Sequence, residues 1–362
     1  MNEHGWVRHF EEIGIDDRPT VGGKGASLGE LLRAGIAVPP GCVVTTDAFR
    51  HFVDVCDRAG AIRRRIEALP ADDLDAIAAA SAEARALLGQ ADLPAALYDG
   101  IAAGLERIRG GDVDAPMAVR SSATSEDSAE ASFAGLQDTY LWIRGVDAVV
   151  EHVRRCCASL YSAESISYRR RLGMLEEGLA MAVVIQRMVD ARSSGVMFTR
   201  SPTTGDRSVV TLEASWGLGS AVVSGEVTPD RFVVAKVTGE IVRRDVSPKL
   251  RRHRPDPSGS GVVDEEVPEA QRTIASVSDA EVLALAAIAR RVERHYGFPQ
   301  DIEWAIAEGC APGEGVFLLQ SRPETVWASR EAAAVAAPRP RAVDHVFALL
   351  GGARAQPRRE AR

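Results

Sequence analysis

Two pairs of polar residues near the carboxyl end have the types and spacing that a metal and phosphate site requires. The segment DIEW sets Asp301 and Glu303 two residues apart, and LLQSR sets Gln320 and Arg322 two residues apart. Side chains alternate along a strand, so each pair would project to one face. If the two strands are neighbours, two carboxylates, an amide oxygen and a guanidinium converge, which suits Mg²⁺ and a phosphate. A surface ladder of ion pairs is the alternative interpretation.

A glycine-rich segment near the amino terminus carries one lysine. VGGKGASLGEL, residues 21–31, places Lys24 in a turn that opens a helix, where backbone N–H groups and the helix dipole favour a phosphate. It is not a Walker A motif, because Arg18 stands where that motif has glycine and Lys24 is followed by Gly25. A glycine turn with a solvated lysine is the alternative interpretation.

Two further segments could contact a phosphate. RSSATSED, residues 120–127, places Arg120 at the end of a short strand beside three hydroxyl residues, where a guanidinium can bind phosphate oxygens in a bidentate manner. The start of a capped helix is the alternative there. ASFAGLQDT, residues 131–139, gathers small residues around Gly135 and is either a loop that covers a phosphate or a plain turn.

The histidines and cysteines indicate no further catalytic or metal site. None of the seven histidines lies in a glycine-rich turn or in a Ser/Asp pattern, so we expect most of them at the surface. The five cysteines include no C-x-x-C motif, which favours a reducing, cytoplasmic compartment. The amino terminus shows no signal peptide, and the longest apolar run, residues 179–185, is too short to span a membrane.

The composition is that of a globular chain with material for two or three cores. The chain has 362 residues, of which 46% are hydrophobic and 26% charged, so a single small module is excluded. The net charge of −8 excludes the diffuse positive field on which non-specific nucleic-acid binders depend. We therefore expect neither a nucleic-acid nor a membrane partner.

The elements that must position the polar residues follow from periodicity and turn signals. Helices are predicted over 26–34, 73–88, 93–108, 146–171 and 279–295. Strands are predicted over 117–120, 182–185, 195–199, 208–212, 231–234, 301–307 and 316–320. We expect a polar loop over 255–271 and a flexible basic tail after residue 338.

Taken in order, these segments resemble the amino-terminal, ATP-binding part of the phosphoenolpyruvate synthase and pyruvate phosphate dikinase family. That family includes rifampin phosphotransferases and phenylphosphate synthases. The resemblance covers about residues 18–327. Its motifs are VGGKGASLGEL (21–31), VPPGCVVTTDAF (38–49), MAVRSSATSEDSAEASFAGLQDTYL (117–141), QRMVDARSSGVMFTRSPTTGD (186–206), EASWGLGSAVVSGEVTPDRFVV (213–234), DIEWAI (301–306) and LLQSRPETVW (318–327).

The resemblance implies an α+β, ATP-grasp-like fold with a mainly helical amino-terminal region and the nucleotide bound between lobes. We expect an amino-terminal lobe with the Lys24 loop over 1–115 and a middle lobe with the phosphate loop over 116–200. A carboxyl-terminal ATP-grasp lobe with the metal site would cover 201–330, and the basic tail 331–362.

The resemblance also implies a role for each candidate residue. Lys24, Arg120 and Arg322 would be the catalytic cations: Lys24 and Arg120 hold the phosphates of ATP, and Arg322 stabilises the transferring phosphoryl group. The loop around Gly135 would cover the phosphates. The remaining expected ligands are Gln186, Met188 and Val189 along the adenine edge, and Glu303, Gln320 and an assisting Asp301 on Mg²⁺. Ser220 departs from the pattern, because many members have an acidic residue there, which puts ribose or lobe-closure contacts in doubt.

Members of the family pass the β-phosphoryl group of ATP to a histidine on a swivelling domain and release AMP and phosphate. No segment here resembles the turn that carries this histidine, so we expect the ATP-binding subunit of a split phosphotransferase, similar to that of phenylphosphate synthase. Its partner would be a companion subunit with the phosphohistidine. Two alternatives remain: a nucleotide-binding sensor or scaffold without turnover, and an ATP lobe that serves a phosphoenolpyruvate-synthase-like or rifampin-phosphotransferase-like system.

Overall fold

A computed structural model describes residues 5–123, 127–128, 131–132, 138–176, 179–310 and 314–327. Met1–Glu324 form one compact unit, and Thr325–Arg362 form a second. Gly135 and the expected basic tail lie outside the described residues. Helices and antiparallel sheets are both present in the first unit, which confirms the mixed α and β content expected from the sequence.

The first sheet has five strands, in the order β1-β2-β7-β3-β6. Every neighbouring pair in it is antiparallel. Apolar residues run continuously through its central strands, because both faces of these strands are buried. The strands are β1 (Val7–His9), β2 (Gly41–Val44), β3 (Met117–Ala123), β6 (Thr139–Ile143) and β7 (Met181–Arg187).

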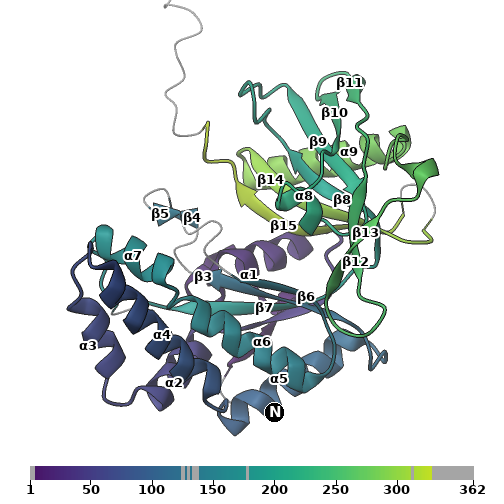
Figure 1. Cartoon of the computed structure of the whole chain (residues 1–362). Helices are drawn as coiled ribbons and strands as arrows, with labels where there is room; N and C mark the ends of the chain where they lie inside the picture. Colours follow the sequence, from purple (N-terminus) through teal and green to yellow (C-terminus); the bar gives the residue numbers. More distant parts are fainter. Residues whose placement is uncertain are drawn as a thin grey trace, which may run out of the picture. The chain divides into compact units, whose positions relative to one another are not determined.

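Helices pack on one face of this sheet, as Figure 1 shows. Their apolar sides and that face of the sheet share one hydrophobic core, which includes Phe52, Ile101 and Val183. The expected helix over 146–171 is two helices, because the chain turns at residues 160–162. The helices are α2 (Thr46–Cys56), α3 (Ala61–Glu67), α4 (Leu74–Gln90), α5 (Ala95–Arg109), α6 (Val146–Ser159) and α7 (Ala163–Arg171).

The second sheet has six strands, in the order β11-β10-β9-β8-β14-β15. The helix α9 (Asp279–Tyr296) begins with a capping box at Ser278 and Glu281 and packs on this sheet. The strands are β8 (Ala191–Phe198), β9 (Val209–Trp216), β10 (Asp230–Ala235), β11 (Ile241–Asp245), β14 (Gln300–Ala307) and β15 (Val316–Pro323).

One helix of the amino-terminal part joins the two sheets. The helix α1 (Arg18–Arg33) packs against β7 and β3 of the first sheet and against β15 of the second, and it lies between the sheets in Figure 1. Its buried residues Leu28 and Leu31 share a core with Val184 of the first sheet and Trp304 of the second. The two sheets are therefore held together by a continuous apolar core.

The chain passes from the first sheet to the second through residues 188–190, between β7 and β8. Neither expected boundary, 115/116 or 200/201, coincides with this change of sheet, and β1 and β2 join strands from beyond residue 116. The expected domain limits stay predictions. A change of sheet could not be located from local sequence, because β7 and β8 have the same strand pattern.

The expectation of a polar loop over 255–271 was wrong. β12 (Arg251–Pro255) and β13 (Val262–Glu266) form an antiparallel hairpin, and Glu269–Gln271 is a short 3₁₀ helix. Cross-strand ion pairs join Arg251 to Asp264 and Arg252 to Glu265, so charged residues that looked loop-like stabilise the pairing.

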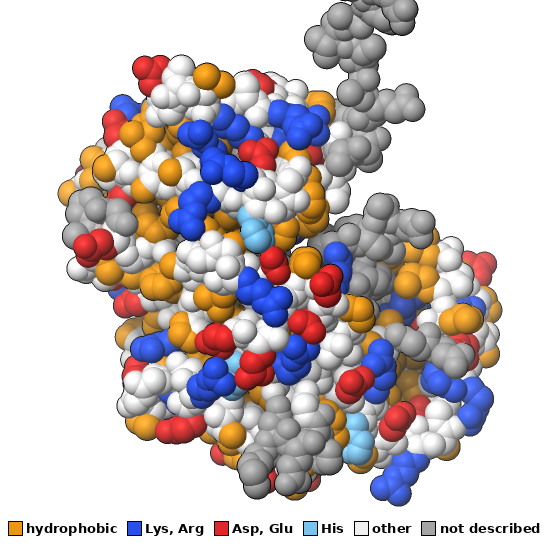
Figure 2. Space-filling view, turned by 180° about the vertical axis from the view of Figure 1, so that it is seen from behind, with side chains coloured by type: hydrophobic (Ala, Val, Ile, Leu, Met, Phe, Trp, Pro, Cys, Tyr) orange, Lys and Arg blue, Asp and Glu red, His pale blue; other side chains and the backbone are white. Residues whose placement is uncertain are grey.

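Small elements complete the described part. Phe10–Glu12 and Ile15–Asp17 are 3₁₀ helices, α8 (Ser220–Val223) follows β9, and β4 (Asp127–Ser128) pairs with β5 (Ala131–Ser132). On the face seen in Figure 2, acidic and basic side chains are mixed over the lower half. Many of the charged side chains of the described residues form surface ion pairs, for example Arg8 with Asp17.

Candidate functional site

A cavity of about 380 Å³ lies between residues of the two sheets; we call it the inter-sheet cavity. Four cationic residues line it, Lys24, Arg120, Arg187 and Arg322, together with the carboxylate of Glu303 and apolar residues from both sheets. Of the candidate residues named from the sequence, those that line this cavity are Lys24, Arg120, Gln186, Met188, Val189, Glu303, Gln320 and Arg322. The structure therefore gathers residues from five separate segments at one place.

The two polar pairs on β14 and β15 face each other as their spacing predicted. The strands are antiparallel neighbours, with Asp301 opposite Arg322 and Glu303 opposite Gln320. The Arg322 Nε lies 3.5 Å from Asp301 Oδ2. Glu303 and Gln320 line the inter-sheet cavity, whereas Asp301 lies one step further along the strand and outside its lining. The pairing of the two strands is confirmed, and the use of these residues as a metal and phosphate site stays a prediction.

Arg120 extends from the first sheet toward Glu303 of the second. Its Nη1 lies 3.5 Å from Glu303 Oε2, its side chain is 12% exposed, and its Nε is buried without a partner among the described residues. The strand β3 continues through Ala123 beyond Arg120, so a helix does not start there. Arg120 lies in the middle of β3 rather than at its end, because the following residues Ser121 and Ser122 continue the pairing with β7.

The Lys24 loop is held by a hydroxyl of β3. Gly22 interrupts α1 with a φ of 70°, a conformation that glycine adopts without steric cost. The amides of Lys24 and Gly25 donate to Ser122 Oγ at 3.1 and 3.3 Å, and that hydroxyl donates to the carbonyl of Val21 at 3.0 Å. These two amides are therefore engaged by the protein, which corrects the expectation that free backbone N–H groups here would meet a phosphate. The Lys24 side chain remains the candidate phosphate contact.

The other end of the inter-sheet cavity is apolar. Met188 and Val189 belong to the crossing between the sheets and pack with Leu218 and Leu319. The amide of Met188 donates to Pro116 O at 2.9 Å, and the Gln186 side chain donates to Pro39 O at 3.3 Å. These apolar side chains suit contact with an aromatic ring, and the assignment of Gln186, Met188 and Val189 to an adenine edge stays a prediction.

Sequence reasoning missed one polar chain at the wall of the cavity. Ser220 lines the cavity, and its hydroxyl lies 2.8 Å from Nδ1 of His253, whose Nε2 lies 3.1 Å from Glu226 Oε2. Because the Glu226 carboxylate can only accept, the neutral His253 ring carries its proton on Nε2 and accepts at Nδ1 from Ser220. The lone pairs of the Ser220 hydroxyl are therefore left for a ligand.

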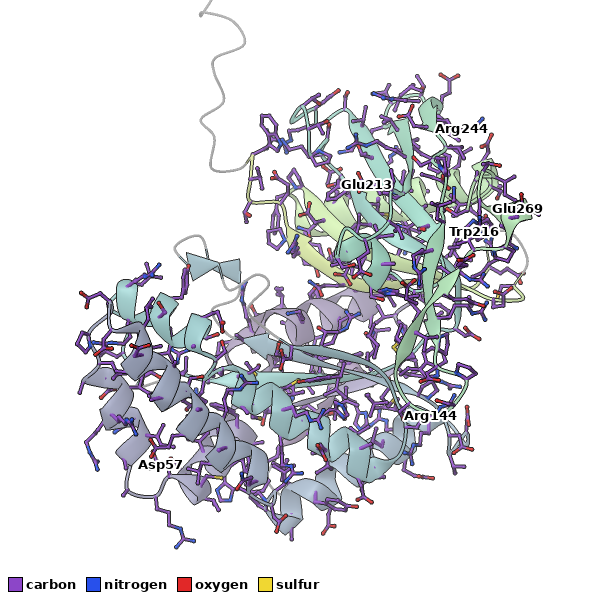
Figure 3. All side chains as sticks on the ribbon, viewed as in Figure 1. Asp57, Arg144, Glu213, Trp216, Arg244 and Glu269 are labelled. Atoms are coloured by element: carbon purple, nitrogen blue, oxygen red, sulfur yellow. The ribbon has the colours of Figure 1, made fainter. Side chains whose placement is uncertain are left out.

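No local signal marked His253, because its position depends on tertiary pairing. Its backbone carbonyl accepts from the amide of Leu218 at 2.9 Å, which fixes β12 beside the loop after β9. Trp216 at the end of β9, labelled in Figure 3, donates its indole N–H to Gln271 O at 3.0 Å. The loop from Trp216 to Ser220 is thus held at both ends, and the His253 side chain is 16% exposed.

The carboxylates suit a metal shared with a ligand. Burial raises the pKa of the Asp301 carboxyl to about 6, although Arg322 opposes the change. Asp301 Oδ1 is buried and has no partner among the described residues. Among those residues no three His, Cys, Asp or Glu side chains cluster as a metal site of their own. Two carboxylates and the Gln320 amide match Mg²⁺, which commonly takes one or two carboxylates plus phosphate oxygens.

The described part of the chain can be compared with the expectations for the cysteines and for membrane-spanning segments. The five cysteines are free thiols, and burial raises the pKa of Cys42 and Cys157 to about 12. No helix in the described ranges combines the length and the apolar character that crossing a membrane requires. The compartment stays a prediction.

Comparison with known proteins gives the same family as the motifs. The sequence matches the family described as pyruvate phosphate dikinase, AMP/ATP-binding domain, over residues 18–342. A probable phosphoenolpyruvate synthase of Methanothermobacter thermautotrophicus is 44% identical over 88% of this chain and 46% of its own length. For the phosphoenolpyruvate synthase of Aeropyrum pernix, the identity is 40% over 96% of this chain and 46% of the relative. A rifampicin phosphotransferase of a Streptomyces species is 41% identical over 88% of this chain and 36% of the relative.

Similarity to solved structures is much weaker. The ADP complex of N5-carboxyaminoimidazole ribonucleotide synthetase is 10% identical, with a TM-score of 0.27, over 71% of this chain and 58% of that chain. At this level the likeness carries no argument. The sequence relatives are sufficient to assign the family, although the chain spans less than half of their length. The resemblance is confirmed: this chain belongs to the pyruvate phosphate dikinase AMP/ATP-binding domain family.

Proposed function

We propose that this chain binds MgATP in the inter-sheet cavity and transfers the β-phosphoryl group of ATP to a histidine of a companion subunit. In this proposal the adenine lies against Met188 and Val189, and the phosphates lie toward Lys24, Arg120 and Arg322. The family match supports the nucleotide, and the relatives named as phosphoenolpyruvate synthases and a rifampicin phosphotransferase support the reaction class.

One observation carries the proposal. Arg120 and Glu303 are 183 residues apart in the sequence, yet they lie 3.5 Å apart in a cavity that Lys24, Gln320 and Arg322 also line. Phosphoryl transfer depends on positioning and on neutralising charge more than on covalent chemistry by the protein. Cations and oxygen ligands around one cavity, with an apolar surface at its other end, are the groups that this chemistry requires.

The proposed step balances with water as the co-reactant. An imidazole nitrogen of the acceptor histidine forms a bond to the β-phosphorus, the bond from that phosphorus to the oxygen of AMP breaks, and the imidazole proton goes to solvent. Water attacks the γ-phosphorus, the bond from that phosphorus to the β,γ-bridging oxygen breaks, and the proton of the water goes to solvent. The second product is therefore inorganic phosphate, and the bridging oxygen stays on the transferred β-phosphoryl group. Lys24, Arg120 and Arg322 stabilise the charge on the transferring group and on the leaving AMP.

Glu303 and Gln320 would hold Mg²⁺, with Asp301 assisting, and the bound ion would neutralise phosphate oxygens and restrict their geometry. The orphaned Asp301 Oδ1 and the two acceptors that line the cavity support this assignment. The ion pair between Arg322 and Asp301 keeps the guanidinium beside this group of oxygens.

We place the acceptor histidine on a companion subunit, in an arrangement similar to that of phenylphosphate synthase. The matched relatives extend well beyond the part that this chain covers, which is 46% or 36% of their length. We place the swivelling histidine domain on a companion subunit that would correspond to the part of the relatives outside the match. The companion would also determine the final acceptor, for which a phenol-like compound, pyruvate and an antibiotic are the candidates.

The test uses ATP labelled at the β-phosphorus, the full chain and a candidate companion. We expect label on a histidine of the companion, together with AMP and inorganic phosphate in equal amounts. ADP as the nucleotide product would refute the dikinase-type reaction. Tight ATP binding without AMP formation, for every histidine-bearing companion tried, would instead support a nucleotide sensor or scaffold.

A further inference from the structure

Three polar side chains form a chain of hydrogen bonds that ends at the wall of the inter-sheet cavity; we call them the Ser220 relay. The Ser220 hydroxyl lies 2.8 Å from Nδ1 of His253, and Nε2 of that ring lies 3.1 Å from Glu226 Oε2. Of the three, Ser220 lines the cavity. Within the described ranges its hydroxyl has no other hydrogen-bond partner.

The direction of the hydrogen bonds in the Ser220 relay follows from its outer end. A carboxylate only accepts, so the neutral His253 ring donates from Nε2 to Glu226 and accepts at Nδ1. The proton of the Ser220 hydroxyl is therefore used in the bond to His253, and its oxygen lone pairs are left for the cavity. A group that binds Ser220 from the cavity must donate a hydrogen bond.

Backbone contacts hold the Ser220 relay in place. The amide of Leu218 donates to the His253 carbonyl at 2.9 Å, and a Cβ on Gly217 would lie 2.4 Å from that carbonyl oxygen. The other end of the β12–β13 hairpin is tied to the first sheet, because the amide of Gly261 donates to Trp142 O at 3.0 Å. Figure 1 shows the hairpin reaching toward that sheet. Contacts to both sheets therefore fix the strand that carries the His253 ring.

Ser220 lies near the boundary between the apolar end of the cavity and the expected metal ligands. A Cβ on the preceding Gly219 would lie 3.5 Å from Ser194 Oγ, and Ser194 is opposite Ala305 of β14. Ala305 belongs to the apolar cluster of this end. Glu303 is two residues from Ala305 on the same strand, and both line the cavity, so they share one face.

Few groups of MgATP can donate a hydrogen bond at this boundary. Phosphate oxygens only accept, so Ser220 does not suit the phosphates, and the donors of ATP are the adenine amino group and the two ribose hydroxyls. The proposed pose directs the adenine edge to Met188 and Val189. The ribose joins the base to the phosphates, so its hydroxyls are the donors that remain for Ser220.

We infer, on the basis of the proposed function, that Ser220 accepts a hydrogen bond from a ribose hydroxyl and favours ribonucleotides over deoxyribonucleotides. His253 is the positioning residue, because its Nδ1 holds the hydroxyl proton away from the ligand. Glu226 in turn fixes the tautomer of the His253 ring.

Calorimetric titration of the full chain with the Mg²⁺ complexes of ATP, 2′-deoxy-ATP and 3′-deoxy-ATP tests this inference. We expect at least one deoxy analogue to bind about three- to tenfold more weakly than ATP, which corresponds to one hydrogen bond. The analogue that loses affinity identifies the hydroxyl. Ser220→Ala should bind that analogue and ATP equally. Ser208→Ala, at an exposed site outside the cavity, should keep the wild-type preference.

Two changes of His253 separate orientation of the hydroxyl from packing. His253→Asn supplies an amide oxygen that can accept from Ser220 and should retain the preference for ATP, whereas His253→Leu has no acceptor and should lose it. Circular dichroism checks that each variant is folded. A purely structural role of the ring would weaken binding of all three nucleotides equally and leave the preference unchanged in His253→Leu, which would overturn the role of His253.

Equal affinity of the wild-type chain for all three nucleotides, or a preference that survives Ser220→Ala, would overturn the role of Ser220. Ser224 also lines the cavity, so loss of the preference in Ser224→Ala but not in Ser220→Ala would assign the contact to Ser224 instead. These results would leave the proposed function standing as long as MgATP binds and AMP forms with the companion. No saturable binding of MgATP would overturn both.

Discussion

Arg120 on β3 and Glu303 on β14 lie 3.5 Å apart and form an ion pair between the two sheets, inside the inter-sheet cavity. Both side chains are largely shielded from water, with 12% and 28% exposure, so the interaction is less screened than a surface pair. The opposite charges of the two side chains partly neutralise each other. In the proposed complex the carboxylate would bind the metal and the guanidinium would bind the phosphate.

Glu303→Ala should abolish Mg²⁺-dependent phosphoryl transfer while the chain remains folded. We expect a loss of about 100-fold or more in turnover, since a proposed ligand of the Mg²⁺ ion that neutralises the phosphate oxygens is removed. Thermal unfolding by circular dichroism and AMP formation from ATP measure the two effects. Glu308→Ala, at an exposed site just beyond the same strand, is the control. Turnover at the wild-type rate in the Glu303 variant would refute the Mg²⁺ assignment.

Gly22→Ala should destabilise the chain and displace the Lys24 loop. The residue has a φ of 70°, and an added Cβ would lie 2.0 Å from the Ser122 carbonyl oxygen, which is backbone and cannot rotate away. We expect a loss of about 2 kcal/mol or more in the free energy of unfolding, measured by urea titration. Gly89→Ala, in open space within α4, should be neutral or stabilising by about 0.5–1 kcal/mol. Equal effects of the two changes would contradict this account.

Asp230→Ala should be among the most destabilising single changes in the second sheet. Asp230 and Lys249 are fully buried and paired, and Asp230 also accepts from the amide of Ser247 and from the amide and hydroxyl of Ser276. Removing the carboxylate leaves an uncompensated buried ammonium, for which we expect a cost of about 3–5 kcal/mol.

Lys249→Met provides the comparison for Asp230→Ala. This change removes one hydrogen-bond donor to Asp230 and leaves three. The loss in the free energy of unfolding, measured by chemical denaturation, should therefore be smaller than for Asp230→Ala. A larger loss for Lys249→Met would show that the ammonium rather than the carboxylate organises this region.

His253→Ala and Ser220→Ala should each weaken ATP binding by about three- to tenfold, which corresponds to one hydrogen bond. The double variant should bind ATP no more weakly than either single variant, because the two residues act through the same contact at 2.8 Å. Calorimetric titration with MgATP measures the effect, and His51→Ala, at an exposed site, is the control. Additive losses would show that His253 acts independently of Ser220.

The polar pairs of β14 and β15 could be predicted because all their determinants are local. Alternation sets which side chains share a face, and a short Gly/Pro loop joins the strands, so their antiparallel pairing follows from sequence. The long apolar stretches of α4, α5 and α9 were predicted for the same reason. Segments that mix charged residues with turn residues were not predicted correctly. The sequence of β13 was interpreted as a loop, because its pairing as a strand depends on ion pairs with Arg251 and Arg252 of β12.

The environment of the site residues could not be predicted. Ser122 Oγ accepts hydrogen bonds from the amides of Lys24 and Gly25, which are 98 and 97 residues away in the sequence. No local sequence pattern near either segment predicts these hydrogen bonds. The contact of Ser220 with His253 likewise requires β12 to lie beside the loop after β9. Such contacts depend on which strands become neighbours, and the order of the strands depends on the packing of the complete hydrophobic core.

The amino-acid sequence by itself determined the family, the cationic and oxygen-bearing residues, and the facing pairs of β14 and β15, since each of these depends on residue type and short-range periodicity. Only the tertiary structure decided that Arg120 meets Glu303, that Ser122 holds the Lys24 loop and that His253 orients Ser220. These contacts form when α1 is buried between the two sheets and the second sheet assembles, and burial of a shared apolar core depends on every segment at once.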